Sequence, residues 1–231
     1  MRKQLTIAVL GATGMAGSRV TAEGGARGHR MLALSRKPGG GDPGNPNVTP
    51  IAVDADDASA LHEALAASGS HGAADAVVVT LRTVPVDEDF LVGATRTVLD
   101  TAARLGIRVL VIGGAGALRS PGDPGLLVAD DPEHVPAEFR AVAAAGVAQL
   151  RTCRSHPHQD WTYLSPPALL HPGERTGRYG RGTDTLLVDA DGRSWISAED
   201  LAVAVIDELE TPGPDHHITV VHRGPDTPAT D

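Results

Sequence analysis

The stretch Leu5–Gly17, LTIAVLGATGMAG, decides the fold. Its first half, Leu5–Leu10, is short and almost wholly apolar, which is typical of a strand buried on both faces in a parallel sheet. Its second half, Gly11–Gly17, spaces three glycines as G-x-x-G-x-x-G directly before Ser18–Arg27, which has a helical pattern. A strand, a glycine turn and a helix in this order favour binding of a pyrophosphate, because free amides and the helix dipole face the anion.

Each glycine of this turn has a predicted role. Gly11 permits the tight exit from the strand, Gly14 lets the backbone approach a pyrophosphate, and Gly17 lets the helix pack near the sheet. Thr13 and Met15 lie between them and are predicted to contact the same ligand. The alternative is a glycine-rich turn that binds nothing. The spacing also differs from the G-x-G-x-x-G of ordinary Rossmann dehydrogenases.

Strand and helix patterns alternate about five times along the chain. Strands are predicted at His29–Ser35, Ile51–Val53, Asp75–Leu81, Ile107–Ile112, Trp161–Leu164 and His217–Val221, and helices at Ala58–Ala67, Phe90–Leu105, Ala137–Arg151 and Ser197–Leu209. A further short strand is predicted at Thr185–Val188, whereas Pro38–Pro50 and His171–Gly182 are predicted loops. Right-handed crossovers turn this alternation into an α/β, Rossmann-like doubly wound parallel sheet with helices on both faces.

Length and composition exclude several classes of protein. The 231 residues predict one globular domain over 1–223, with substrate-binding loops in its C-terminal part and a frayed tail over 224–231. No apolar run approaches the ~20 residues of a membrane span, and no secretory signal is visible. The net charge of −9 argues against nucleic acid as a partner, and the single cysteine fits a reducing cytoplasm. The expected partner is a small molecule, and the oligomeric state stays open.

The end of the second strand bears on the choice of dinucleotide. NAD enzymes usually have an acidic residue there, which binds the ribose hydroxyls. This strand ends Ser35-Arg36-Lys37, without a carboxylate. An arginine at this place suits a 2′-phosphate, so NADP(H) is favoured over NAD(H). The alternative is a solvated pair of charges in a loop.

The same rule of position selects further cofactor residues, because ligands of such sheets bind outside the carboxyl ends of the strands. Asp54 follows the third strand and is predicted either to border the adenine or only to cap the next helix. The residues that end the other strands are Thr80, Leu81 and Arg82 beside the cofactor, Gly113 near the nicotinamide ribose, and Ser165 and Pro166 beside the nicotinamide.

Six segments carry a family resemblance: GATGMAG at 11–17, the arginine of Ser35-Arg36-Lys37, Asp54, VIGGAGAL at 111–118, DWTYLSPPALLHPGERTGRY at 160–179 and ISAEDLAVAVIDEL at 196–209. Together they resemble the atypical short-chain dehydrogenase/reductases, in the NAD(P)H-binding group of NADH–flavin reductases, biliverdin/flavin reductases and NmrA-like proteins. The resemblance spans nearly the whole chain. It implies a single Rossmann-like domain and a nicotinamide cofactor, with the substrate stacked over the nicotinamide.

Two departures from the wider family affect the expected chemistry. Ordinary short-chain dehydrogenases use a Tyr-x-x-x-Lys pair, but Tyr163 and Tyr179 are followed four residues later by Pro167 and Thr183. Ala115 stands where the biliverdin/flavin reductases have a serine. A flavin or quinone tolerates both losses, because hydride transfer to such a ring needs proximity and stacking, with the proton taken from solvent.

The sequence therefore predicts an NADPH-dependent oxidoreductase that transfers hydride to a flavin, quinone or similar conjugated small molecule. No catalytic residue is assigned and no metal site is predicted. The candidate substrate-pocket residues are Arg82, Ala115, Leu118, Pro167 and His171. The alternatives are a non-catalytic NADP(H)-binding sensor, as NmrA-like proteins are, and a cyclase or isomerase that kept the fold.

Overall fold

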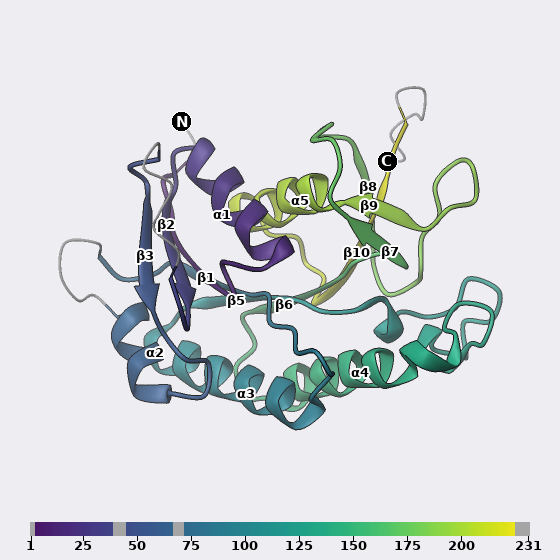
Figure 1. The fold of residues 1–231 in the computed structure, drawn as a ribbon, viewed down its shortest axis with the longest axis horizontal. Helices are drawn as coiled ribbons and strands as arrows, with labels where there is room; N and C mark the ends of the chain where they lie inside the picture. Colours follow the sequence, from purple (N-terminus) through teal and green to yellow (C-terminus); the bar gives the residue numbers. More distant parts are fainter. Residues whose placement is uncertain (1–2, 39–44, 67–71, 225–231) are drawn as a thin grey trace.

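A computed structural model describes residues 3–38, 45–66 and 72–224 (Figure 1). Its central sheet has eight strands in the order β3-β2-β1-β4-β5-β6-β10-β8, all parallel to their neighbours except β8, which is antiparallel to β10. The strands are β1 Thr6–Leu10, β2 Arg30–Ser35, β3 Val48–Ala52, β4 Ala76–Val79, β5 Arg108–Ile112, β6 Trp161–Ser165, β8 Tyr179–Gly182 and β10 His217–His222. This arrangement confirms the predicted Rossmann-like sheet.

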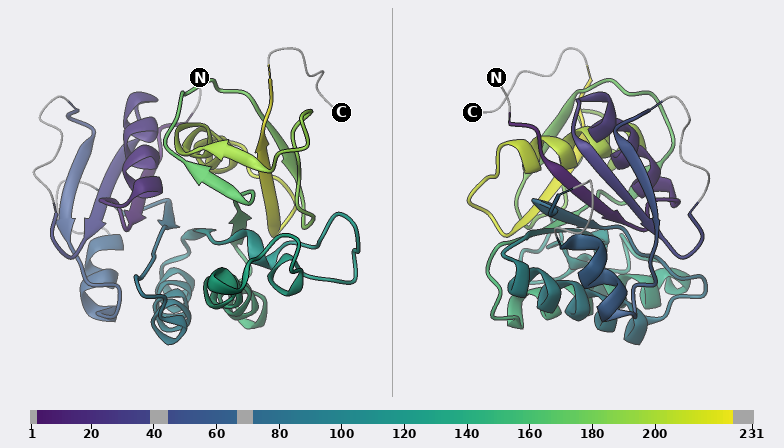
Figure 2. Two further views of the ribbon diagram at one scale, coloured as in Figure 1. Left: turned by 45° about the vertical axis from the view of Figure 1, so that its right-hand side comes forward. Right: turned by 90° about the vertical axis from the view of Figure 1, so that its left-hand side faces the viewer.

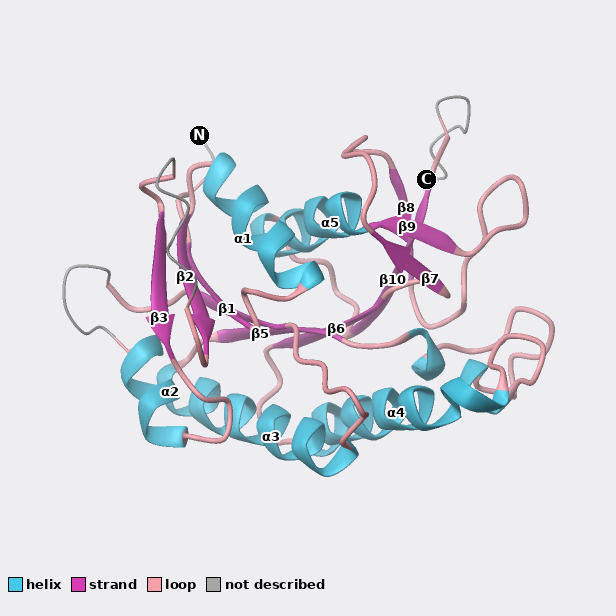
Figure 3. Ribbon diagram, viewed as in Figure 1, coloured by secondary structure: helices cyan, strands magenta, loops and turns pink. Residues whose placement is uncertain are grey.

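Helices cover both faces of the sheet (Figure 3). On one face lie α1 (Met15–Ala26) and α5 (Ala198–Glu210), and on the other lie α2 (Ala58–Leu65), α3 (Glu88–Leu105) and α4 (Arg140–Ser155). The β4 sequence shows why two layers form. Its consecutive valines point to opposite faces, Val77 and Val79 into the core beneath α3 and Val78 into the core beneath α5. Since both faces are apolar, both must be covered. No helix among the described residues is long and apolar enough to cross a membrane.

Two of the predicted boundaries are wrong. The third strand begins at Val48, inside the predicted loop Pro38–Pro50, and it includes Pro50. A proline is tolerated there because β3 is the outermost strand of the sheet and needs no hydrogen bonds on its free side. Thr185–Val188 is not a strand, since Thr185 forms only an isolated bridge with Arg119.

The C-terminal part contains strands that the sequence pattern missed. β8 and the end of β7 (Leu169–His171) lie within the predicted loop His171–Gly182. β7 pairs with β9 (Trp195–Ser197) in a separate two-stranded sheet, which lies beside α5 and β10 (Figure 2). The predicted tail falls almost entirely outside the described residues, which end at 224.

The turn after β1 is fixed by a side chain from β4. The hydroxyl of Thr80 donates to the carbonyl oxygens of Leu10 and Gly11, each at 3.1 Å. Gly11 has a φ of +91°, and a side chain there would collide with Thr80. A side chain on Gly17 would collide with the carbonyl of Gly11. The first turn of α1 therefore lies directly against the end of the sheet.

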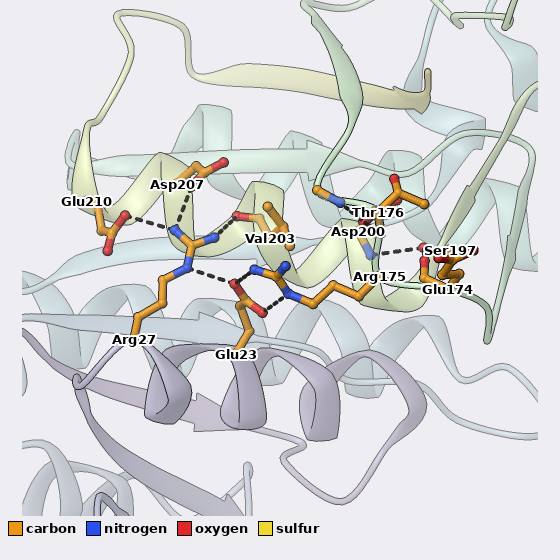
Figure 4. Close-up of polar contacts among 11 residues, drawn as sticks. Glu23, Arg27, Glu174, Arg175, Thr176, Ser197, Asp200, Val203, Asp207 and Glu210 are labelled. Atoms are coloured by element: carbon orange, nitrogen blue, oxygen red, sulfur yellow. Dashed lines mark hydrogen bonds and ion pairs between the residues drawn. The ribbon is translucent and has the colours of Figure 1, made fainter. Parts of the chain in front are cut away.

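A segment between β7 and β8, residues 173–177, ties α1 to α5, and we call it the strap (Figure 4). Arg175 donates twice to Glu23 of α1, both times at 2.7 Å. Glu23 is only 7% exposed and also accepts from Arg27 at 2.8 Å. Arg27 in turn reaches α5, where its Nη1 contacts Asp207 at 2.6 Å and Glu210 at 2.9 Å.

The other end of the strap is held by the first turn of α5. Asp200 is 0% exposed and accepts hydrogen bonds from the Thr176 amide at 2.8 Å, the Thr176 hydroxyl at 2.6 Å and the Gly177 amide at 2.7 Å. The Ser197 hydroxyl, which caps α5, donates to the carbonyl of Glu174 at 2.9 Å (Figure 4). The strap thus satisfies a buried carboxylate that would otherwise be unpaired.

Replacing Asp200 tests this anchor. Asp200→Ala leaves three donors of the strap without their acceptor, so we expect the free energy of unfolding in urea to fall by at least about 3 kcal/mol. Asp191→Ala removes a carboxylate from an exposed pair with Arg193 and serves as the control, with a loss below about 1 kcal/mol. Equal losses for the two variants would contradict the proposed anchoring role of Asp200.

The pairing of Glu23 predicts a pH dependence. Hydrogen bonding to Arg175, together with the nearby Arg27, holds the pKa of Glu23 below its ordinary value of 4.5. A lowered folded-state pKa contributes stability that is present above pH 4.5 and is lost as the pH falls further. We expect Glu23→Gln to be less stable than the wild type at neutral pH and to lose less stability on acidification. If the unfolding free energies of the wild type and Glu23→Gln fell by the same amount between neutral and acid pH, the prediction would be contradicted.

Candidate functional site

A cavity of about 450 Å³ lies at the carboxyl ends of β1, β2, β3 and β4. Parallel strands of a doubly wound sheet bring their carboxyl ends to one edge, and ligands of such folds bind there. Of the predicted cofactor residues, the cavity wall contains Gly11, Thr13, Gly14, Arg36, Asp54, Thr80, Leu81 and Arg82. Residues from four separate strand ends therefore surround one space.

The start of α1 forms one end of this cavity. Gly14 is the N-cap of α1 and has no side chain to occupy the amides of the first turn. Its φ is −75°, which any residue can adopt, and an added Cβ would meet only the Gly11 carbonyl oxygen, at 3.3 Å. Glycine at 14 is thus less strictly required by the fold than glycine at 11 or 17. Its effect is to leave the surface of the turn open, where the helix dipole favours an anion.

The end of β2 contributes a hydroxyl and a positive charge. Ser35 is 7% exposed, and its hydroxyl has no hydrogen-bond partner among the described residues. Arg36 is exposed and forms no ion pair or hydrogen bond with the described part of the chain. Both residues line the cavity. A buried hydroxyl without a partner costs about 1–3 kcal/mol, so an oxyanion bound here would satisfy a group that the fold leaves unpaired.

The far wall of the cavity is partly apolar. Val53, Leu81 and Phe90 line it, and Asp54 lies beside them. The interpretation of Asp54 as a helix cap is wrong, because the N-cap of α2 is Asp57, whose carboxylate accepts from the amides of Ser59 and Ala60 at 3.0 Å. Capping therefore does not account for Asp54.

Some wall residues were missed by sequence reasoning. They are Ser35, Val53, Ala55, Asp56, Thr83, Asp87 and Phe90. Asp87 caps α3 by accepting from the amide of Phe90 at 2.9 Å. The predicted helix Phe90–Leu105 already begins just after the carboxyl end of β4, so the position of Phe90 at this edge of the sheet was the signal that could have found it.

Gly113 lies outside this cavity, and packing explains its lack of a side chain. A Cβ at this position would overlap the ring of Tyr163. The Tyr163 hydroxyl donates to the carbonyl of Gly146 at 2.8 Å and contacts the side-chain oxygen of Gln149 at 3.3 Å. A Cβ on Gly116 would likewise collide with Ala143 of α4. The glycines after β5 therefore let α4 and β6 approach, whether or not they also make room for a ligand.

The other predicted residues are distributed around the same edge without lining the cavity. Met15 is exposed in the first turn of α1, whereas Gly17 is buried beneath Gly11. Pro166 and Pro167 are buried after β6. Ser165 is also buried, and its hydroxyl lies 3.0 Å from the Nε2 atom of His217.

The candidate substrate residues are likewise spread. Leu118 is fully buried in a cluster with Val128 and Leu186, so its side chain serves the core. Ala115 is half-buried in the short 3₁₀ turn after β5. His171 is exposed and stacks on Trp195, with ring centres 5.6 Å apart and planes 8° apart.

The candidate substrate residue Arg82 differs in its contacts from Arg119, the residue that follows Leu118. Arg119 is engaged by Asp184 at 2.9 Å and by the carbonyl of Pro124 at 2.6 Å. Arg82 is exposed and, within the described residues, forms no such contact. Only Arg82 is thus available to a ligand without breaking an ion pair.

Neither tyrosine hydroxyl is free. Burial raises the pKa of Tyr163 far above its ordinary value, and its hydroxyl is bonded within the core. The hydroxyl of Tyr179 donates to Asp207 at 2.7 Å, and burial together with that carboxylate raises its pKa as well. Both side chains thus contribute to packing between secondary-structure elements.

Comparison with known proteins agrees with this geometry. The sequence model of an NAD(P)H-binding family matches residues 11–212. The chain is 33% identical over 214 residues to the uncharacterized protein YwnB of Bacillus subtilis, covering 90% of this chain and 93% of that protein.

Solved structures resemble it along their whole length. An exported protein, provisionally so named, of Burkholderia pseudomallei is 38% identical, with a TM-score of 0.82 and coverage of 95% of this chain and 100% of that one. A Streptococcus pneumoniae protein provisionally named an NADH-flavin reductase is 26% identical, with a TM-score of 0.79 and coverage of 94% and 99%. The chain is therefore a member of the NAD(P)H-binding family, within the atypical short-chain dehydrogenase/reductases.

Proposed function

We propose that the cavity binds NADP(H) and that the protein uses it to reduce a flavin, quinone or similarly conjugated small molecule. The observation that carries the cofactor proposal is the pair at the end of β2. Within the described ranges, the buried hydroxyl of Ser35 and the guanidinium of the following residue, Arg36, have no hydrogen-bond or ion-pair partner, and both residues line the cavity. A hydroxyl and a guanidinium together match the oxygens of a 2′-phosphate.

The remaining wall residues fit the other parts of a dinucleotide. Gly11, Thr13, Gly14, Met15 and Gly17 belong to the turn and first helical residues that would hold the pyrophosphate, where free amides and the α1 dipole favour negative charge. Thr80 would contribute indirectly, by holding this turn in place, because its hydroxyl is already bonded to the carbonyl oxygens of Leu10 and Gly11.

A second group of residues would hold the two ends of the cofactor. Asp54 and the apolar side chains of Leu81 and Phe90 form a wall suited to adenine. Following the carboxyl edge across the sheet, we assign Gly113, Ser165 and Pro166 to the nicotinamide end. The acceptor would lie near Arg82, Ala115, Leu118, Pro167 and His171, with Leu118 acting only from the core.

The proposed reaction needs no acidic side chain. A bound NADPH supplies hydride, and the protein holds the acceptor ring against it while water supplies the proton. The two tyrosine hydroxyls support this assignment, because both are bonded to other protein groups and both have raised pKa values. Conjugated rings suit such a site, since the negative charge that develops is delocalised over the acceptor itself.

Replacing Arg36 tests the cofactor proposal. Arg36→Ala removes the cation that would pair with the 2′-phosphate, so we expect the Kd for NADPH in calorimetry to rise by about 10–100-fold. The Kd for NADH should stay nearly the same, because NADH lacks that phosphate. Arg30→Ala is the matched control, since Arg30 is an exposed arginine at the opposite end of the same strand.

Three outcomes separate the possibilities. Binding of neither nucleotide by the wild type would contradict the whole proposal. Equal binding of both nucleotides, unaffected by Arg36→Ala, would contradict the NADP(H) preference alone. Tight NADPH binding without oxidation by flavins or quinones would instead favour a sensor.

Tyrosine variants test the mechanism. If no tyrosine hydroxyl donates a proton, Tyr179→Phe and Tyr163→Phe should keep kcat for NADPH oxidation with a flavin or quinone acceptor within about threefold of the wild type. A tyrosine acting as general acid raises the reaction rate about 10²–10⁴-fold, so removal of its hydroxyl would lower kcat far more than threefold. Each variant is assayed below its own melting temperature, because Tyr163→Phe leaves the Gly146 carbonyl without its donor.

A further inference from the structure

A second cavity, of about 540 Å³, lies at the edge of the sheet opposite the nucleotide turn. Its walls come from the last turn of α4, the first residues of β6 and β10, and the segments that precede β10 and follow β8. The residues that line it are Arg154, Trp161, Thr183, Asp184, Pro214, Asp215, His216 and His217. Since β6 and β10 are parallel and both begin here, this is the amino edge of the sheet.

Two buried nitrogen atoms in this wall have no hydrogen-bond partner among the described residues. They are Nε1 of Trp161 and Nδ1 of His217, in side chains that are 5% and 7% exposed. Buried polar atoms are nearly always hydrogen-bonded, so two such nitrogen atoms on neighbouring strands, both in residues that line one cavity, indicate a missing partner.

The contacts of His217 suggest which of its nitrogens carries hydrogen. Its Nε2 lies 3.0 Å from the hydroxyl of Ser165, which has no other hydrogen-bond partner within the described ranges. When the Ser165 hydroxyl donates to Nε2, Nε2 carries no hydrogen. The one hydrogen of the neutral ring is then on Nδ1, which is the donor beside the cavity. Burial, followed by the charge of Arg154, lowers the pKa of His217 to about 4, so the ring is neutral at pH 7.

Among the charged groups that line the cavity, one cation has no partner in the described part of the chain. Asp184 is paired with Arg119 at 2.9 Å, and Asp215 is paired with Arg181 at 2.9 Å. His216 directs its Nδ1 to the carbonyl of Trp161 at 2.8 Å. Arg154 is exposed and, among the residues described, has neither an ion pair nor a hydrogen bond.

We propose that this cavity binds the oxyanion group, carboxylate or phosphate, of a small molecule. The indole N–H of Trp161 and the Nδ1–H of His217 would donate to it from the wall, and the guanidinium of Arg154 would pair with its charge. An indole N–H can only donate, which favours an acceptor-rich ligand over a cation. The site lies at the opposite sheet edge from Gly11, so its occupation does not compete with a dinucleotide for space. His217 is nevertheless hydrogen-bonded to Ser165, which the proposed function assigns to the nicotinamide end.

The indole of Trp161 can report binding directly. Trp195→Phe leaves Trp161 as the only tryptophan of the chain. In this background we would titrate inorganic phosphate and, separately, sodium acetate, with sodium chloride keeping the ionic strength constant. We expect a saturable change of Trp161 fluorescence with at least one of the two anions. A response to phosphate alone identifies the ligand group as a phosphate, and a response to both identifies a general oxyanion site.

Two arginine variants give the test its specificity. Arg154→Gln removes the unpaired cation, and we expect the apparent Kd of the anion to rise at least about tenfold, the effect of one charged hydrogen bond. Arg151→Gln is the matched control, because Arg151 is exposed on the same helix and does not line the cavity. An equal effect of the two variants would mean non-specific charge screening and would overturn the proposal.

A second readout does not depend on fluorescence. The pKa of His217, followed by NMR of its ring, should rise when phosphate binds, because a nearby negative charge favours the protonated ring. Arg154→Gln should raise this pKa without phosphate and abolish its response to phosphate. Trp161→Phe keeps an aromatic ring but removes the N–H, and it should weaken the response. If neither phosphate nor acetate changed the pKa of His217 in the folded wild type, the proposal would be overturned.

Discussion

The close approach of α1 to the end of β1 is the constraint on which the site depends. Gly11, Gly17 and Thr80 meet there with no room for another side chain, and the Thr80 hydroxyl holds the two carbonyls that the turn exposes. Because the turn cannot move away from β4, the amides at the start of α1 face the edge where β2 and β4 also end. The cavity is the space that this fixed turn leaves beside Arg36, Asp54 and Leu81.

Local sequence patterns were sufficient for most of the half of the sheet that contains this cavity, the start of β3 excepted. The apolar runs of β1 and β4, the glycine turn and the end of β2 each have a short signature that no distant contact overrides. Eight of the sixteen residues that line the cavity were among the predicted cofactor residues, and their assignment to a cofactor stays a prediction. Val53 and Phe90 were missed because an apolar residue at the end of a strand or the start of a helix is also expected where it only packs in the core.

The C-terminal part was harder because its structure depends on pairings that are distant in the sequence. β8 contains two glycines and an arginine in four residues, and it is a strand only because β10 pairs with it some forty residues later. The glycine at 113 looked like room for a ligand, yet the ring of Tyr163 fills the space where its Cβ would lie. The strap could not be predicted from local sequence either, because Arg175 and Glu23, which it joins, are 152 positions apart.

The pairing of α1 with α5 has a consequence for how the chain acquires its structure during synthesis. α2 and α3 follow their strands closely and can cover one face of the growing sheet early. The opposite face is covered at first by α1 alone, and Val20 and Met31 lack their packing against Leu201 and Ile206 until α5 has been synthesised. Arg27 likewise gains its ion pair with Asp207 only when that residue, 180 positions later, is present. Part of the apolar surface of the sheet therefore stays uncovered until late in translation, and a chaperone that binds apolar surface would act before α5 is complete.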